Sequence, residues 1–422
     1  MKWNSIHRLG ILVGPFLTSC RAEESDTRVR FLLNLCHCAE KAPRLLEWRP
    51  VRVCASSRRI IQVALTVFFI TVLPSSTLFG QPRVEEAEIA FTEILRLGED
   101  TDENAYLFGR IVDLAVDSKD RILIADHQPP SVAVFSVDGE WLGSVGGVGE
   151  GPGEYVSVGD VDVGPSDSVY VMDWEKRILR VYDPTDFTYV RQIRFPYDRD
   201  DGGAVTSVVG VSDHGPIMRY GTGIRPENVG KPRHSYVFLT SWAGERIREL
   251  ACLPSLEMYV RLSPDRGPVV QTIKFARYPV FRLSASQLLY SGWNAEIDIL
   301  VTSLAGDTVR TIRWPHDPVP LTRDDIPARL DAEARKMYPE FKPAYRSFVI
   351  DDQDNIWIKD YVEAPASEAR WQVLDPEGRM IGQVLLPRTL TLYVIDTANA
   401  LAYGTLRSES GEYMVVVYSV DF

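Results

Sequence analysis

Side chains that could bind a polar ligand recur at one place in this chain, directly after short β-rich runs such as residues 122–125 and 168–172. Carboxylates at such places can accept hydrogen bonds or hold Ca²⁺, and aromatic rings can stack on a sugar or a peptide. We therefore expect these side chains to converge and to orient a polar ligand. The candidate ligand-binding residues are Asp126, His127, Asp173, Trp174, Glu175, Lys176, Tyr220, Trp293, Asn294, Asp360, Tyr361 and Arg407.

The three aspartates among them also have a purely structural interpretation. Asp126, Asp173 and Asp360 occupy one position of a repeat, where a short acceptor satisfies the backbone donors of a turn. We favour this role for the aspartates, and the sequence leaves ligand binding open beside it.

The repeat itself is a β-rich unit of 40 to 50 residues. Residues 111–146 and 158–195 share one internal layout, and Val116 and Val163 fall at equivalent places 47 residues apart. Short β-rich runs within each unit are separated by turn formers such as Asp138-Gly139. This period, with several strands per unit, predicts a β-propeller blade.

Six such units are predicted, beginning at residues 111, 158, 205, 278, 346 and 391. The sixth has only three strands, at 391–395, 400–405 and 413–420, and the unassigned run 88–97 can supply its fourth. Pairing the two ends would close the ring and remove exposed sheet edges. The predicted fold class is therefore all-β: a six-bladed β-propeller of four-stranded blades over residues 82–422, closed by an N-terminal strand.

Three blade phrases carry a resemblance to known proteins: "ILIADHQPPSVAVFSVDGEWLGSVGGVGEGPGEY", "SVYVMDWEKRILRVYDP" and "FVIDDQDNIWIKDY". Over about residues 88–422 the chain resembles a bacterial six-bladed β-propeller family related to the NHL-type propellers. The resemblance implies the architecture. It implies no activity, because propellers host unrelated functions.

Long insertions are predicted on one face of the ring. Connections from strand two to three of a blade, and from strand four to the next blade, emerge on the same side. The segments 146–155, 221–233, 252–276 and 315–344 all fall in such connections, and we call this side the elaborated face. Residues 324–337 predict a short helix that caps the funnel, with Thr322 or Asp324 as N-cap. The elaborated face is the default binding site.

The glycine-rich run 146–153 resembles a phosphate-binding loop only superficially. No Lys followed by Ser or Thr comes after it, and a strand rather than a helix follows. A tight connection between blades is the better interpretation.

Charge excludes one class of partner. Residues 1–81 carry 11 Lys and Arg against 5 Asp and Glu, whereas the other 341 residues carry 35 against 53. A body this acidic repels phosphate backbones, so nucleic acid is not expected as a partner. We expect a polar small molecule, a glycan or a protein partner, and a monomeric chain.

The first 81 residues read as a targeting leader. Residues 57–59 (Ser-Arg-Arg), the apolar run 60–73 and residues 74–76 (Pro-Ser-Ser) have the layout of a signal peptide. The run has 14 residues, fewer than the ~20 of a membrane-spanning helix, so cleavage is favoured over an uncleaved anchor. Upstream, Cys20 ends a segment similar to a lipoprotein signal, and translation from near Val51 or Val53 would reconcile the two segments. An exported protein is expected, in the periplasm, the envelope or outside the cell.

The alternative function is enzymatic. The chain has no G-x-S-x-G and no H-E-x-x-H motif, and we assign no catalytic residue and no cofactor. A metal-dependent hydrolase similar to propeller lactonases would need a central Ca²⁺ or other divalent cation, for which Glu175, Asn294 and Asp360 are the available ligands. A binding module is the favoured hypothesis.

Overall fold

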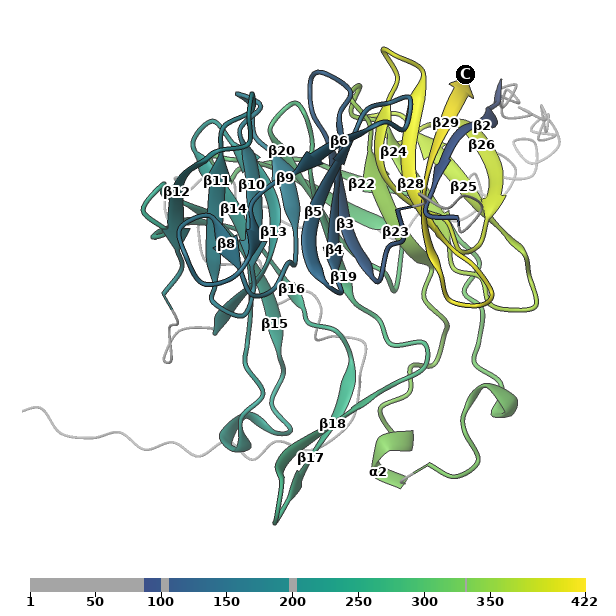
Figure 1. Ribbon diagram of the computed structural model, residues 1–422. Helices are drawn as coiled ribbons and strands as arrows, with labels where there is room; N and C mark the ends of the chain where they lie inside the picture. Colours follow the sequence, from purple (N-terminus) through teal and green to yellow (C-terminus); the bar gives the residue numbers. More distant parts are fainter. Residues whose placement is uncertain (1–86, 100–105, 197–202, 331) are drawn as a thin grey trace, which may run out of the picture. The chain divides into compact units, whose positions relative to one another are not determined.

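The structure is a computed structural model and describes residues 87–99, 106–196, 203–330 and 332–422. In these residues the strands form six blades arranged as a ring (Figure 1). The predicted six-bladed β-propeller of four-stranded blades is confirmed. The predicted leader, with Cys20, the apolar run 60–73 and the expected start of the mature chain, lies outside the described residues.

The first three blades are antiparallel sheets whose strands follow one another in chain order. Blade one contains β3 (Ile111–Val116), β4 (Ile122–His127), β5 (Pro130–Phe135) and β6 (Trp141–Ser144). Blade two contains β9 (Val161–Val163), β10 (Val169–Asp173), β11 (Ile178–Tyr182) and β12 (Tyr189–Arg194). Blade three contains β13 (Ala204–Ser212), β14 (Gly215–Gly221), β15 (His234–Thr240) and β16 (Arg246–Pro254).

The other three blades keep this plan, with additions from the N-terminal side. Blade four contains β19 (Pro279–Leu283), β20 (Leu288–Trp293), β21 (Asp298–Ser303) and β22 (Thr308–Arg313). Blade five contains β23 (Tyr345–Ile350), β24 (Ile356–Asp360), β25 (Glu368–Leu374) and β26 (Met380–Pro387), and β1 (Ala87–Glu88) joins it in parallel with β26. Blade six contains β27 (Thr391–Asp396), β28 (Leu401–Arg407), β29 (Tyr413–Asp421) and β2 (Ala90–Leu97).

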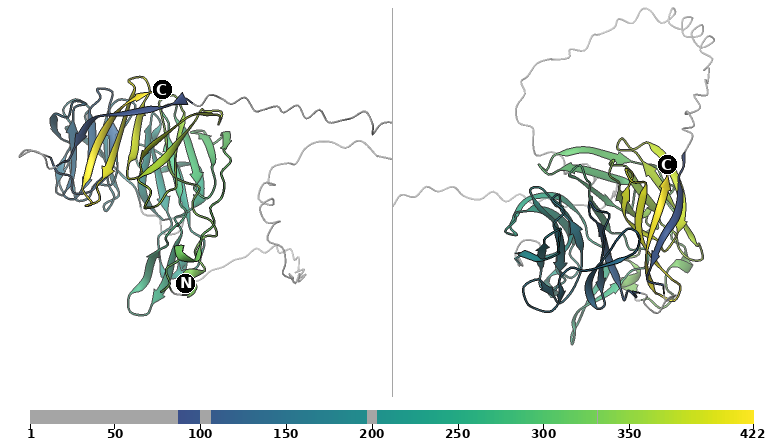
Figure 2. Two further views of the ribbon diagram at one scale, coloured as in Figure 1. Left: turned by 90° about the vertical axis from the view of Figure 1, so that its right-hand side faces the viewer. Right: turned by 45° about the horizontal axis from the view of Figure 1, so that its top comes forward.

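Strand β2 is the outer strand of blade six and pairs antiparallel with β29, from Ala90 opposite Asp421 to Leu97 opposite Val415. The two strands lie side by side in both views of Figure 2. The ring of Phe91 lies 6.0 Å from that of Trp357 and 5.6 Å from that of Tyr418. Chain segments more than 300 residues apart therefore share one sheet.

Burial explains why the middle strands read as continuous apolar runs. Ile122, Leu123, Ile124 and Ala125 of β4 are all fully buried, because both faces of a blade pack against neighbouring blades. The outer strand β12 alternates between exposed and more buried positions. The core thus lies between blades, and the first strands are left to face the centre of the ring.

The six first strands surround a central channel. Each of β3, β9, β13, β19, β23 and β27 lies next to the first strands of the two neighbouring blades. Side chains that point inward from these strands therefore meet, although their positions in the sequence are far apart.

The connections of the elaborated face contain structure of their own. The hairpin of β17 (Met258–Ser263) and β18 (Gly267–Thr272) projects from the ring on the same side as α2 (Ala332–Arg335), as Figure 1 shows. Smaller elements in these connections are β7 (Gly147–Val148), β8 (Glu154–Tyr155) and the 3₁₀ turns η1 (Pro226–Asn228) and η2 (Arg323–Asp325). None of the helices among the described residues has the length and apolar composition needed to cross a membrane.

The single helix predicted over residues 324–337 is wrong. Two short elements, η2 and α2, stand in its place. Ile326 is extended, with φ −102° and ψ 123°, because the following Pro327 disfavours helical backbone at the residue before it. Thr322 does flank the first element, and its backbone N–H and hydroxyl both donate to the Asp325 carboxylate at 2.8 and 2.9 Å.

Candidate functional site

Two of the predicted aspartates hold loops. Asp126 accepts hydrogen bonds from the backbone N–H groups of Gly109, Arg110 and Gln128 at 2.7, 2.8 and 2.8 Å. Asp173 accepts from the N–H of Val156 and forms a buried ion pair with Arg180 at 3.1 Å. Both carboxylates are buried. Their bonds tie the connection that enters each blade to the end of its second strand.

Asn294 and Asp360 are also engaged in hydrogen bonds. The Asn294 side chain accepts from the Tyr278 N–H at 2.8 Å and donates to the Tyr345 carbonyl at 3.2 Å, which links blades four and five. Asp360 accepts from Arg370 and Gln372 of β25 at 2.8 and 2.6 Å. The Asn294 side chain therefore holds two blades together, and the Asp360 side chain holds the end of β24 to β25.

Nine of the twelve predicted residues do not line the central channel: Asp126, His127, Asp173, Trp174, Glu175, Lys176, Tyr220, Trp293 and Asn294. Trp174 is 48% exposed and its ring lies 6.3 Å from that of His127, whereas Tyr220 is buried. Asp360, Tyr361 and Arg407 do line the channel. In the part of the chain that the structure describes, no group of three His, Cys, Asp or Glu side chains is arranged to hold a metal ion.

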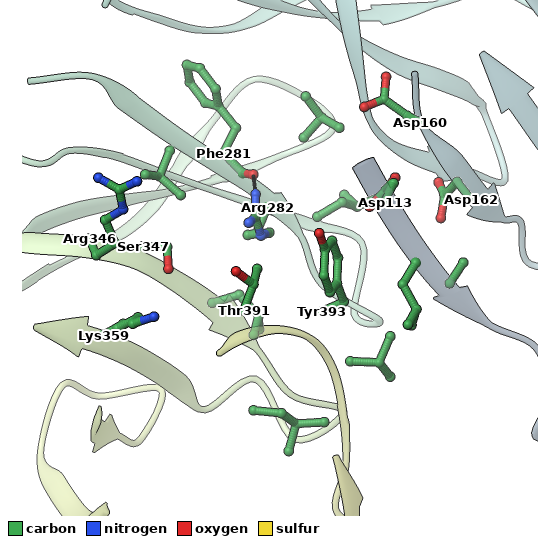
Figure 3. A pocket seen from close by; sticks show the side chains of 18 of the residues that line it. Asp113, Asp160, Asp162, Phe281, Arg282, Arg346, Ser347, Lys359, Thr391 and Tyr393 are labelled. Atoms are coloured by element: carbon green, nitrogen blue, oxygen red, sulfur yellow. Dashed lines mark hydrogen bonds between the residues drawn. The ribbon is translucent and has the colours of Figure 1, made fainter. Parts of the chain in front are cut away.

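The channel forms a cavity with a volume of about 1510 Å³. It is bordered by the turns after the first strands at one end and by residues 360–364 of the elaborated face at the other. Figure 3 shows Asp113, Asp160 and Asp162 on one side and Arg346 and Lys359 on the other. The three acids thus lie apart from Arg346 and Lys359, while Arg219 and Arg282 line the channel close to the acids.

The acidic side comes from blades one and two. Asp113 accepts from the Val161 N–H at 3.0 Å and Asp160 from the Val208 N–H at 2.9 Å, so each reaches the first strand of the next blade. Asp162 accepts from its neighbour Val163 at 2.9 Å through one oxygen. Its other oxygen is buried and has no hydrogen-bond partner among the described residues.

Burial changes the protonation of these acids. It raises the pKa of Asp160 to about 6, against the opposing effect of the Val208 N–H and of Arg219. Burial, helped by the charge of Asp160, raises the pKa of Asp162 to about 7 and that of Asp113 well above its usual range. This side of the channel exchanges protons near neutral pH and can both accept and donate hydrogen bonds.

The cationic side comes from blades five and six, at the end nearest the elaborated face. Lys359 is 6% exposed, and its Nζ donates to the carbonyls of Arg388 and Leu390 at 2.8 and 2.5 Å. Burial, together with the positive charges of Arg346 and Arg388, lowers the pKa of Lys359 to about 8. Among the described residues, no carboxylate pairs with Arg346, Lys359, Arg388 or Arg407.

Acids close to these cations are already neutralised by other residues. Asp360 pairs with Arg370 at 2.8 Å. Glu363 pairs with Lys342 at 2.9 Å and with Lys274 at 3.0 Å, and Lys342 also pairs with Asp325 at 3.0 Å. These pairs attach the 315–344 insertion to blade five and leave the channel cations uncompensated.

The sequence contains a signal for this site that the prediction did not use. Asp113 and Asp160 are 47 residues apart, as are Val116 and Val163. Asp113 lies within the short first strand of blade one, Asp160 lies directly before that of blade two, and Arg282 lies within the first strand of blade four. Charged residues within these strands mark the positions that face the channel.

Comparisons with known proteins agree with the fold. A family model described as "6-bladed beta-propeller" matches residues 99–205, which contain blades one and two. No curated protein matches the chain.

Solved structures resemble the chain at low sequence identity. A Bacteroides fragilis protein described as exported is 10% identical, with a TM-score of 0.47 over 78% of this chain and 94% of that one. A Bacteroides vulgatus protein is 10% identical, with a TM-score of 0.47 over 80% and 99% of the two chains. A gluconolactonase from Xanthomonas campestris is 15% identical, with a TM-score of 0.38 over 79% and 96%. Similarities at this level carry no argument about function.

Proposed function

We propose that this protein is an exported binding protein that takes a polar ligand into its central channel from the elaborated face and releases it unchanged. The observation that carries this proposal is the group of cations, Arg346, Lys359 and Arg388, that have no acidic partner among the described residues. Lys359 is buried among them, and a buried charge costs free energy unless a complementary group offsets that cost. A ligand with polar groups at matching places supplies that offset.

Binding can be tested by blocking the channel. Ser347 lies on the first strand of blade five and lines the channel (Figure 3). We expect Ser347→Trp to abolish capture of ligands that the full-length protein binds on glycan and peptide arrays. Thr311→Trp, on the exposed outer strand β22, is the matched control and should bind as the wild type does. Equal binding by the two variants, both with wild-type melting temperatures, would place the site outside the channel.

Export is supported by the apolar run 60–73, which follows two arginines and precedes small residues. We expect the mature chain to begin between Ser76 and Val84. N-terminal sequencing of protein from the envelope fraction of the native host checks this. A cytoplasmic protein that retains residues 1–60 would contradict it.

A further inference from the structure

The ligand's chemistry can be inferred from the two sides of the channel. We propose that the ligand is an acidic oligosaccharide, with the carboxylate of a uronic acid ring bound between Arg346, Lys359 and Arg388 and with ring hydroxyls facing Asp113, Asp160 and Asp162. This inference rests on the proposed binding function and narrows it to one substrate class.

An anionic group fits the cationic end because hydrogen-bond donors there are unused. Lys359 has three N–H donors, and two of them bind the carbonyls of Arg388 and Leu390. The third has no hydrogen-bond acceptor among the described residues, and the centre of the Trp371 ring lies 5.6 Å from Nζ. Arg346 is exposed at the channel, and among the described residues its guanidinium has no hydrogen-bond or ion-pair partner. A planar guanidinium beside an ammonium donor matches a carboxylate, which can accept from both.

The opposite side restricts the rest of the ligand. A second anionic group there would be repelled by Asp160 and Asp162 in their ionised forms, whose pKa values lie at about 6 and 7. A cationic group has less to gain, because Arg282 already attracts Asp113 and Arg219 attracts Asp160. Hydroxyl groups remain, because a hydroxyl can donate to or accept from the carboxyl groups of the aspartates that line the channel. A polyhydroxylated acid therefore fits better than a peptide.

Aromatic rings at the cationic end support a saccharide. Tyr278 and Tyr361 line the channel beside Arg346, whose charge acts on both phenols. The Tyr278 hydroxyl donates to the Arg346 carbonyl at 2.5 Å, which fixes its ring. Sugar rings stack on such faces. The cavity of about 1510 Å³ exceeds the ~300–1,000 Å³ of pockets for drug-sized molecules, so an oligomer fits better than one sugar.

The test uses the full-length protein and calorimetric titration with trisaccharides of galacturonate, glucuronate and mannuronate. Each acid is paired with the same trisaccharide whose carboxyl groups have been reduced to hydroxymethyl groups. We expect at least one acid to bind about tenfold or more tightly than its reduced form, which corresponds to about 1.4 kcal/mol. Its affinity should fall as salt is raised from low to high concentration.

The variant Arg346→Gln separates the carboxylate contact from the rest of the site. It should weaken binding of the acid about tenfold and leave the reduced form unaffected. Arg313→Gln is the matched control, because Arg313 is an exposed arginine of the outer strand β22 that pairs with Asp298. It should bind both forms as the wild type does.

Four results would overturn the inference. Equal affinity for the acid and reduced forms would show that the protein makes no contact with the carboxylate that favours binding. If a peptide from the array binds more tightly than any of the trisaccharides and its binding depends on Arg346, the ligand is a peptide and not a saccharide. If the protein captures only a neutral glycan, and Ser347→Trp blocks that capture, the proposed binding function is supported and the proposed acidic ligand is wrong. If neither the titrations nor the arrays yield any ligand, both this inference and the proposed binding function are wrong.

Discussion

Replacing residues 90–97 by a glycine–serine segment of equal length should abolish the single cooperative unfolding transition of the propeller and cause aggregation. Strand β2 covers β29 along most of its length, so its loss leaves an exposed edge that can pair with other chains. Phe91, Leu95 and Leu97 would also lose their places against the core. Full burial of one such side chain contributes about 1.5–3 kcal/mol, and a domain's whole stability is about 5–15 kcal/mol.

Thermal unfolding followed by circular dichroism, with light scattering on the same samples, measures this effect. Ile94→Thr is the control in the same strand, because the Ile94 side chain is 53% exposed. It should change stability by no more than about 0.5 kcal/mol. If the glycine–serine variant unfolds in the wild-type transition and stays monomeric, closure by β2 has no energetic importance.

The six blades could be predicted because their signal is local and repeated. Apolar runs such as residues 122–125, bounded by turns such as Asp138-Gly139, recur with nearly constant spacing. The hairpin of β17 and β18 was missed for the same reason. Its strands pair on either side of the turn "PDRG". They fall outside the period of the blades, so the prediction assigned them to a connection.

The channel could not be predicted in the same way, because it exists only when the ring forms. Asp113 and Arg282 belong to the first strands of blades one and four and meet across the centre of the fold (Figure 3). In the sequence each is a charged residue within a short apolar strand, which indicates a channel-facing position but not the residue that lies opposite. The residues that end the second strands, such as Asp126, stand out more clearly because each follows a run of apolar residues. The role of a carboxylate depends on its hydrogen-bond partners, which the sequence alone does not identify. Both Asp126 oxygens accept hydrogen bonds, whereas one Asp162 oxygen has no partner among the described residues.

Asp162 should make the stability of the protein depend on pH in a way that Asp162→Asn removes. Burial raises its pKa from 3.8 to about 7 in the folded protein, so folding favours the protonated carboxyl. The stability that this proton contributes is complete below about pH 4, where the unfolded chain also carries it. It is lost as the pH rises through 7, because the folded protein must then bury a carboxylate.

The asparagine stays neutral at every pH, so the variant and the wild type should have similar stability at pH 4. At pH 8 the variant should be the more stable by up to about 4 kcal/mol, from a pKa difference of roughly three units at 1.36 kcal/mol each. Urea unfolding at pH 4, 6 and 8 measures the difference. Asp213→Asn, at an exposed turn residue, is the control and should follow the wild type throughout. Parallel stability profiles for Asp162→Asn and the wild type would show that Asp162 is ionised without cost, and that the acidic side of the channel is better solvated than its burial implies.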